Sequence, residues 1–565
     1  MQISFLKTLK NLLRRLDLNN KKQILYFGII SLASSGAEFI AVGSLVPFIA
    51  YITNDSKISF ILDYFPIINS FQMIYVVGGF FIGSNILAGL LKILVLKKSC
   101  NVSFEIGSNI NRILLTEFLH SDYEKFILKS KENYVDIFTT KINGVINNFV
   151  LSIFTLINSI FTIIALTTLL LIINTNATII TFLCLSLTYI VVSILTNKSS
   201  SINGKTLNIE SKNIISVIQN SIGNIREIMI SHTHHKYIGE LLDVDRRIKR
   251  SQAKIVMISQ SPKFIIETVG LCLVGIITLY MGGAEVNIIS SLPFLAILAL
   301  SAQKMLPCFQ LCYLNYSVIK SSEPAASEIA NILNSYIQKP SNTINSIINF
   351  FNDIKINDVS YSYNNGNKLV LKNCNYIISK GDRVAIIGKS GSGKSTLVDI
   401  IIGLLNPTKG SILIDDVLLD KSNMASWQKR ISIVSQDIHI INGTIIDNIL
   451  LDLDGPIDYN KLNESIRLAS LDALIKTLSD GVNHYLHDNG GTLSGGQKQR
   501  IGIARAIYRG GDIFIFDEAT SALDKNTAVS IFDLIYLLPK SATIIIISHD
   551  HSLLSGCNKL INMDL

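Results

Sequence analysis

The stretch that decides the fold of the C-terminal half reads Val384-Ala385-Ile386-Ile387-Gly388-Lys389-Ser390-Gly391-Ser392-Gly393-Lys394-Ser395-Thr396. It joins an apolar strand to a helical run through the pattern Gly-x-x-x-x-Gly-Lys-Ser. In this context the glycines let backbone N–H groups converge on phosphate oxygens, and the helix N-terminus adds a favourable dipole. We therefore predict that residues 388–396 bind the phosphates of ATP. Lys394 is expected to reach the β and γ phosphates, and Ser395 to ligate Mg²⁺.

A second stretch, Ile513-Phe514-Ile515-Phe516-Asp517-Glu518, is an apolar strand that ends in two carboxylates. A strand that is apolar on both faces belongs inside a sheet. At its end, Asp517 is suited to hold Mg²⁺ and Glu518 to polarise an attacking water. Together with the phosphate loop, this strand predicts ATP hydrolysis.

Between these two stretches, Leu493-Ser494-Gly495-Gly496-Gln497 opens another helical run. Serine and glycine at a helix start form a second anion site of the same physical kind. One reason for having two such sites is that the second contacts the γ phosphate of ATP held by another copy of the chain. The expected assembly is then a symmetric homodimer with ATP sandwiched between the copies.

Residues 346–565 resemble the ATP-binding cassette (ABC) family, in which the motif at 493–497 is the signature sequence. The resemblance implies four further site residues. These are an adenine-stacking Tyr363, Gln436 as the glutamine that senses Mg²⁺, Asp524 in a loop that crosses the dimer interface, and His549 as the switch histidine. Having both Glu518 and His549 implies a cassette that hydrolyses ATP.

The N-terminal half is hydrophobic. The whole chain is 48% hydrophobic and only 16% charged, with a mean hydropathy of +0.41, whereas a soluble domain carries about a quarter charged residues. Six apolar stretches are long enough to cross ~30 Å of hydrocarbon, which takes about 20 helical residues. They lie near 23–52, 73–96, 146–173, 177–197, 263–283 and 291–319.

Basic residues are distributed unevenly between the connections. Lys57 is the only Lys or Arg after the first, third and fifth stretches, whereas the N-terminal segment and the long loops after the second and fourth carry many. The positive-inside rule then places both termini, both long loops and the ATPase domain in the cytoplasm, with the spans in the inner (plasma) membrane. The same distribution accounts for the net charge of +8 without a nucleic-acid partner.

We therefore predict an all-α six-helix transmembrane domain over 1–320, a linker over 321–345, and an α/β ABC-type P-loop ATPase domain over 346–565. The segments 123–126 and 225–237 in the two long loops are candidates for coupling the domains. Plain helix packing is the alternative for both.

The order of the two domains resembles ABC exporters. Val46–Ile49 and Phe118-Leu119 resemble the bacterial lipid-linked oligosaccharide flippases, which implies an amphipathic, anionic, lipid-linked substrate. Lys304 and Lys263 lie within spans, where ionisable residues are costly and often functional. The resemblance implies basic residues near these positions, which would suit a head group such as a lipid pyrophosphate.

Alternatives remain open at this stage. Lys304 and a further intramembrane lysine, Lys92, are also explained by reaching toward the cytoplasm. Glu38 and Glu267 are possible partners of the lysines, and such pairing would weaken the case for an anion site. Export of a peptide or a hydrophobic drug is a second possibility. An ATP-gated channel is a third, against which Glu518 argues.

Overall fold

A computed structural model describes most of the chain. The described residues are 4–14, 17–52, 70–127, 131–173, 175–283, 288–335, 346–363, 369–451, 455–487, 490–519, 523–536, 538–548 and 554–564. Two compact units are present: Met1–His120 with Lys129–Ile337, and Ser121–Leu128 with Gln338–Leu565. The short segment 121–128 therefore groups with the second unit, although it lies within the first half of the sequence.

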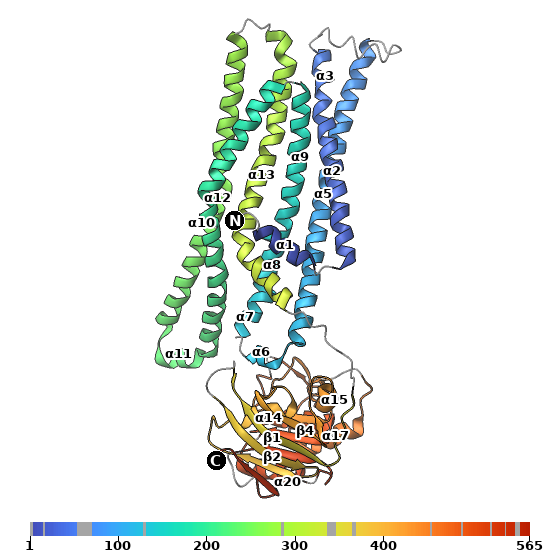
Figure 1. Ribbon diagram of the computed structural model, residues 1–565, viewed down its shortest axis with the longest axis vertical. Coiled ribbons are helices and arrows are strands. Elements are labelled where there is room, and N and C mark those ends of the chain that lie inside the picture. The colour runs from blue at the N-terminus through green and yellow to red at the C-terminus, as the bar shows by residue number, and fades with distance from the viewer. Residues whose placement is uncertain are drawn as a thin grey trace. The chain divides into compact units, whose positions relative to one another are not determined.

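The first unit is made of helices (Figure 1). They are α1 (Ser4–Arg14), α2 (Leu18–Gly43), α3 (Leu45–Ile52), α5 (Ser70–Leu119), α7 (Lys131–Asp136), α8 (Ile142–Val145), α9 (Leu151–Ile173), α10 (Thr175–Gly223), α11 (Ile225–Ser231), α12 (His234–Gly283) and α13 (Ile288–Ser335). The 50 residues of α5 give it a length of about 75 Å at 1.5 Å per residue. A bilayer needs less than half of that, so this helix continues beyond the hydrocarbon.

Three helical stretches among the described residues are long and apolar enough to cross a membrane. They are Leu18–Phe48, Ile74–Leu119 and Tyr134–Ile172, which contain the first three predicted spans in whole or in large part. The other three predicted spans fall on α10, α12 and α13, where many side chains lie outside the described residues.

The end of α13 corrects one expectation. The predicted linker begins at 321, but the helix continues to Ser335. The reason is that this segment has an apolar face although its overall composition is polar. This face consists of side chains at helical spacing that are at most 1% exposed: Ala326, Ile329, Ala330 and Leu333.

Polar side chains join the buried faces of α2 and α9. The Ser31 hydroxyl donates to Asn158 Oδ1 at 2.8 Å, and the Ser35 and Thr162 hydroxyls lie 3.4 Å apart. In a bilayer, unpaired polar groups are costly, so such interhelical bonds both require and fix close helix contacts. Two of these residues, Asn158 and Thr162, also line the cavity described below.

The second unit is an α/β domain with two main sheets (Figure 1). An antiparallel sheet has the order β2-β1-β4-β5, and a parallel sheet the order β11-β3-β10-β9-β6. The strands are β1 (Asp353–Tyr361), β2 (Leu371–Ser379), β3 (Arg383–Ile387), β4 (Lys409–Ile414), β5 (Val417–Leu418), β6 (Ile431–Val434), β7 (Gly443–Thr444), β8 (Tyr485–Leu486), β9 (Ile513–Asp517), β10 (Thr543–Ile547) and β11 (Lys559–Asn562). The helices are α6 (Tyr123–Ile127), α14 (Lys394–Ile402), α15 (Met424–Gln428), α16 (Ile445–Leu450), α17 (Tyr459–Leu468), α18 (Asp472–Thr477), α19 (Gly495–Arg509) and α20 (Lys525–Ile535). The predicted fold class, helical domain followed by α/β ATPase domain, is confirmed.

The apolar strand β9 lies inside the parallel sheet, hydrogen-bonded to β10 on one side and β6 on the other. Its first four residues, 513–516, are at most 5% exposed. Because the carboxyl ends of parallel strands meet at one edge, the residues that follow β3, β6 and β9 are brought together there.

Ile515 and Trp427 share one hydrophobic core, and Trp427 is the only tryptophan in the chain. Its fluorescence therefore reports unfolding of the α/β unit in the intact protein. We expect Ile515→Ala to destabilise this unit by roughly 2–5 kcal/mol, because it leaves a cavity in a fully buried strand. The measurement is the thermal midpoint of the tryptophan signal. Leu166→Ala, at a fully buried position in the helical unit, is the control and should leave that midpoint unchanged; an equal shift would contradict separate cores.

Candidate functional site

The phosphate loop connects β3 to α14, which begins at Lys394. Gly391 and Gly393 have φ of +82° and +94°, a region that glycine adopts without strain. At Gly393 a Cβ would also lie 2.8 Å from a Leu371 methyl, so the loop backbone needs glycine there for space as well. The Lys394 ammonium donates to the carbonyl oxygens of Gly388 at 2.8 Å and Lys389 at 3.0 Å, which holds it across the loop.

One buried polar atom of the loop fits a phosphate ligand. The Ser392 hydroxyl oxygen is inaccessible to solvent and has no hydrogen-bond partner among the described residues. A cleft of about 360 Å³ beside it is lined by Ser392, Met563, Val370 and the β2 segment 371–376. A buried hydroxyl without a partner is costly, and a phosphate oxygen would accept its hydrogen bond. The residues present therefore suit the predicted nucleotide.

The Mg²⁺ ligands predicted from sequence lie together. Asp517 at the end of β9 is hydrogen-bonded to Ser395 at the start of α14. Burial raises the pKa of Asp517, and the nearby Glu518 charge adds to this effect, although the Ser395 bond and the Lys394 charge oppose it. A carboxylate and a hydroxyl are oxygen ligands of the kind Mg²⁺ prefers, and a cation would relieve the raised pKa.

Glu518 and Gln436 are also in contact, because they follow the neighbouring strands β9 and β6. Gln436 Nε2 donates to Glu518 Oε2 at 3.0 Å. Glu518 has φ of +47°, which is uncommon for a residue with a side chain, and its N–H donates to Ile547 O at 3.0 Å. Backbone strain of this kind persists only where the surroundings impose it, and it concentrates at functional sites.

Tyr363, the predicted adenine partner, lies beside the phosphate loop. Its hydroxyl is 3.1 Å from the Thr396 hydroxyl, and its ring packs edge-on against Tyr361. Glu124 on helix α6 lies close enough to Tyr361 to influence its ionisation. Burial raises the pKa of Tyr361, and the charge of Glu124 raises it further. The segment 123–126 thus contacts the nucleotide end of its own unit, while its coupling role stays a prediction.

Sequence reasoning missed Asp399, which lies one helical turn after Ser395 on α14. Burial and the charge of Asp517 raise the pKa of Asp399 to about 6. The spacing of four residues from Ser395 was the available signal, since it places both side chains on one face of the helix.

The signature motif opens α19 with a capping box. The Ser494 hydroxyl accepts from Gln497 N at 3.2 Å, and Gln497 Oε1 accepts from Ser494 N at 2.8 Å. The hydroxyl of exposed Ser494 and the amides of Gly495 and Gly496 are thereby fixed at the helix start. Asp524 similarly caps α20 by accepting from Thr527 N at 3.0 Å, and that bond lowers its pKa. His549 lies outside the described residues.

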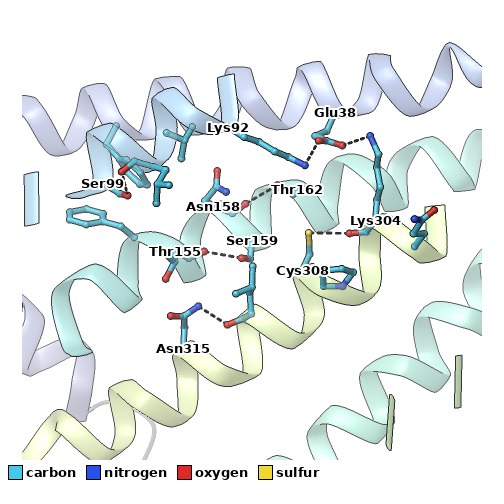
Figure 2. Close-up of a pocket in the computed structure, with 17 residues that line it drawn as sticks. Glu38, Lys92, Ser99, Thr155, Asn158, Ser159, Thr162, Lys304, Cys308 and Asn315 are labelled. Carbon is cyan, nitrogen blue, oxygen red and sulfur yellow. Dashed lines mark hydrogen bonds and ion pairs between the residues drawn. The ribbon is translucent and has the colours of Figure 1, made fainter. Parts of the chain in front are cut away.

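A separate cavity of about 590 Å³ lies in the helical unit between α2, α5, α9 and α13 (Figure 2). Lys304 Nζ donates to Glu38 Oε2 at 3.1 Å and to Asn85 Oδ1 at 3.4 Å, and Lys92 pairs with the other Glu38 oxygen. Of the two possible partners, Glu38 therefore pairs with both Lys92 and Lys304. Lys263, on α12, is exposed and does not line this cavity, so the structure does not bring it together with Lys304.

Comparison with known proteins agrees with this geometry. Residues 371–521 match the family described as ABC transporter. The fold of the whole chain is that of an ABC exporter: a bacterial Atm1-family ABC exporter with ATP bound superposes with a TM-score of 0.79 at 17% identity, covering 96% of this chain and 93% of the other. The resemblance to ABC exporters predicted from the motifs is thus confirmed.

Two curated relatives are similar in sequence. The ATP-dependent lipid A-core flippase of Francisella tularensis subsp. holarctica is 33% identical over 271 residues, which is 48% of this chain and 44% of the relative. The alpha-hemolysin translocation ATP-binding protein HlyB of Escherichia coli O157:H7 is 35% identical over 291 residues, 51% of this chain and 41% of the relative. The chain spans less than half the length of these relatives.

The contacts of Tyr363 predict that it contributes to the binding of ATP. We expect Tyr363→Ala to raise the KM for ATP about ten-fold with little change in kcat, because base–aromatic stacking contributes roughly 1–3 kcal/mol. Tyr363→Phe should stay within about three-fold, since it loses only the bond to Thr396. Steady-state ATPase assays measure both constants. Tyr459→Ala, at an exposed tyrosine on α17, is the control. A KM unaltered by Tyr363→Ala would show that adenine does not stack there.

Proposed function

We propose that the chain is one half of an ATP-hydrolysing ABC exporter of the flippase type, acting as a homodimer in the inner (plasma) membrane with its ATPase domain in the cytoplasm. The observation that carries this proposal is the meeting of Lys394, Asp517 and Glu518 at one edge of the parallel sheet. At that edge the phosphate-binding Lys394 lies near the carboxylate of Glu518, and ATP hydrolysis requires both groups.

Each residue has a task that follows from its position. Lys394 and the loop amides bind and orient the phosphates, and Ser392 supplies a further hydrogen bond. Ser395 and Asp517 would hold Mg²⁺, which when bound neutralises phosphate charge. Glu518 orients a water and accepts its proton, while the bond from Gln436 fixes the carboxylate in place. His549 is proposed, by the family resemblance, to contact the γ phosphate.

The cargo is proposed to be an amphipathic, anionic, lipid-linked molecule, with an oligosaccharide as the linked group. Its support is the cavity in the helical unit, which presents the ammonium groups of Lys92 and Lys304 inside a domain whose exterior is apolar. One relative is named as a lipid A-core flippase. Lys304 is the substrate residue we favour; Lys263, which lies apart from this cavity, is retained only through the family resemblance.

The transport proposal is tested in reconstituted vesicles. An anionic lipid-linked oligosaccharide should be translocated on addition of ATP, and Glu518→Gln should lower hydrolysis by about 100-fold or more while ATP still binds. Glu464→Gln, which changes an exposed carboxylate on α17, is the matched control and should behave as the unmodified protein. Stimulation by peptides but not lipids would support the peptide-exporter alternative, and an ATP-dependent conductance that persists in Glu518→Gln would support a channel.

The dimeric site is tested on heterodimers of two inactive chains, isolated through a different affinity tag on each chain. Lys394→Ala disables the phosphate loop of one copy, and Ser494→Arg disables the signature motif of the other. If each site takes its loop and signature from different copies, the isolated heterodimer retains one complete site, and its single-turnover hydrolysis should return to about half of the unmodified value per dimer. The isolated heterodimer of the double variant with the unmodified chain is the control, because it holds no complete site. Activity in the control but not in the heterodimer of the two single variants would contradict a shared site.

A further inference from the structure

The cavity of the helical unit contains a carboxylate between two ammonium groups (Figure 2). Glu38 on α2 is only 3% exposed in its side chain, and its two oxygens pair with Lys92 of α5 and Lys304 of α13. The lysines are more accessible, at 52% and 25%. The carboxylate is therefore a fixed part of the interior, and the ammonium groups are the part that a ligand can reach.

The charges around the cavity do not balance. Among the described residues that line it, Lys92, Lys304 and Glu38 are the charged ones, so the site carries one net positive charge. An uncompensated charge inside a membrane domain is costly. A ligand with one negative charge would bring the site to neutrality, whereas a ligand with two would leave it with a net negative charge beside a carboxylate that cannot move into water.

Three hydroxyl groups that line the cavity contribute little to the recognition of charge. The hydroxyls of Ser99, Thr155 and Ser159 each donate to a carbonyl of their own helix. A hydroxyl that donates in this way can still accept a hydrogen bond. These groups therefore suit the hydroxyls of a sugar, and the two lysines with Glu38 determine how much negative charge the cavity accepts.

We propose that Glu38 sets the charge of the cargo: the cavity selects a lipid whose head group carries a single negative charge, such as a sugar phosphodiester, over one that carries two. The inference rests on the proposed function, and deepens it. It departs from the lipid pyrophosphate expected from sequence, because sequence analysis did not establish that one carboxylate neutralises half of the lysine charge.

A series of variants that changes the charge of the site tests this proposal. The probes are two polyprenyl lipids of equal chain length with the same sugar, one joined through a phosphodiester and one through a diphosphate diester. The readouts are thermal stabilisation of the detergent-solubilised full chain and stimulation of its ATPase. The unmodified protein should respond to the singly charged lipid at about ten-fold lower concentration, a factor that corresponds to roughly 1.4 kcal/mol.

Glu38→Gln raises the site to two positive charges and should reverse the preference toward the diphosphate lipid. Glu38→Gln combined with Lys92→Gln returns the site to one positive charge, and should restore the original preference. This double variant separates charge from structural damage, because damage would not be repaired by a second substitution. Glu210→Gln, which breaks a carboxylate–Arg247 pair outside the cavity, is the matched control and should leave the preference unaltered.

The outcomes distinguish a failure of the role proposed for Glu38 from a failure of the proposed exporter function. Equal responses to both lipids, or a preference that Glu38→Gln does not change, would overturn the role of Glu38 while leaving an anionic lipid exporter in place. Binding of neither lipid in any variant, together with stimulation by a peptide, would overturn the proposed function and the inference with it.

Discussion

The parallel register of four strands is the constraint on which the α/β unit depends. Ile547 of β10 pairs with Ile386 of β3 and with Asp517 of β9, and Val434 of β6 pairs with Phe516. The strands therefore end within a residue or two of one another. A shift of one strand by two residues, about 6.6 Å, would separate the phosphate loop from the carboxylates by more than a hydrogen bond can span. The buried faces of β9 make such a shift unfavourable, because its apolar side chains fit the core in one register only.

The helical unit depends on a different principle. Its interior holds buried serine, asparagine and ionisable side chains, including Lys141, whose ammonium nitrogen lies 3.3 Å from Asp136 and 2.7 Å from Glu328. Buried ion pairs contribute little net stability, because desolvation opposes the attraction, but removing one partner is strongly destabilising. Such groups therefore specify which helices meet. Glu38 and its two lysines follow the same rule, with the difference that their charges do not cancel.

Motifs whose chemistry is local could be predicted from sequence. The phosphate loop, the apolar strand ending in Asp517 and Glu518, and the capped helix start at Ser494 each depend on neighbours in the chain, and the structure contains all three. Contacts between distant segments could not be predicted in the same way. The helical end of α13 was hidden by its polar residues, the contact of Glu124 with Tyr361 joins positions far apart in sequence, and Lys263 was grouped with Lys304 although it lies on another helix away from the cavity. In each case the deciding factor was a tertiary neighbour.

The two halves of the nucleotide site that we propose for the homodimer are each ordered within a single chain. On one side Lys394 is held by two carbonyls and Glu518 by Gln436, and on the other Ser494 is held by its capping box with Gln497. Groups fixed beforehand lose little conformational entropy when a ligand brings them together. In the proposed homodimer, the binding energy of ATP is then available for moving whole cassettes instead of ordering side chains. Ser121–Leu128 groups with the α/β unit, and α5, which lines the cavity, ends at Leu119, so the chain passes from one unit to the other there. A coupling role for this segment stays a prediction.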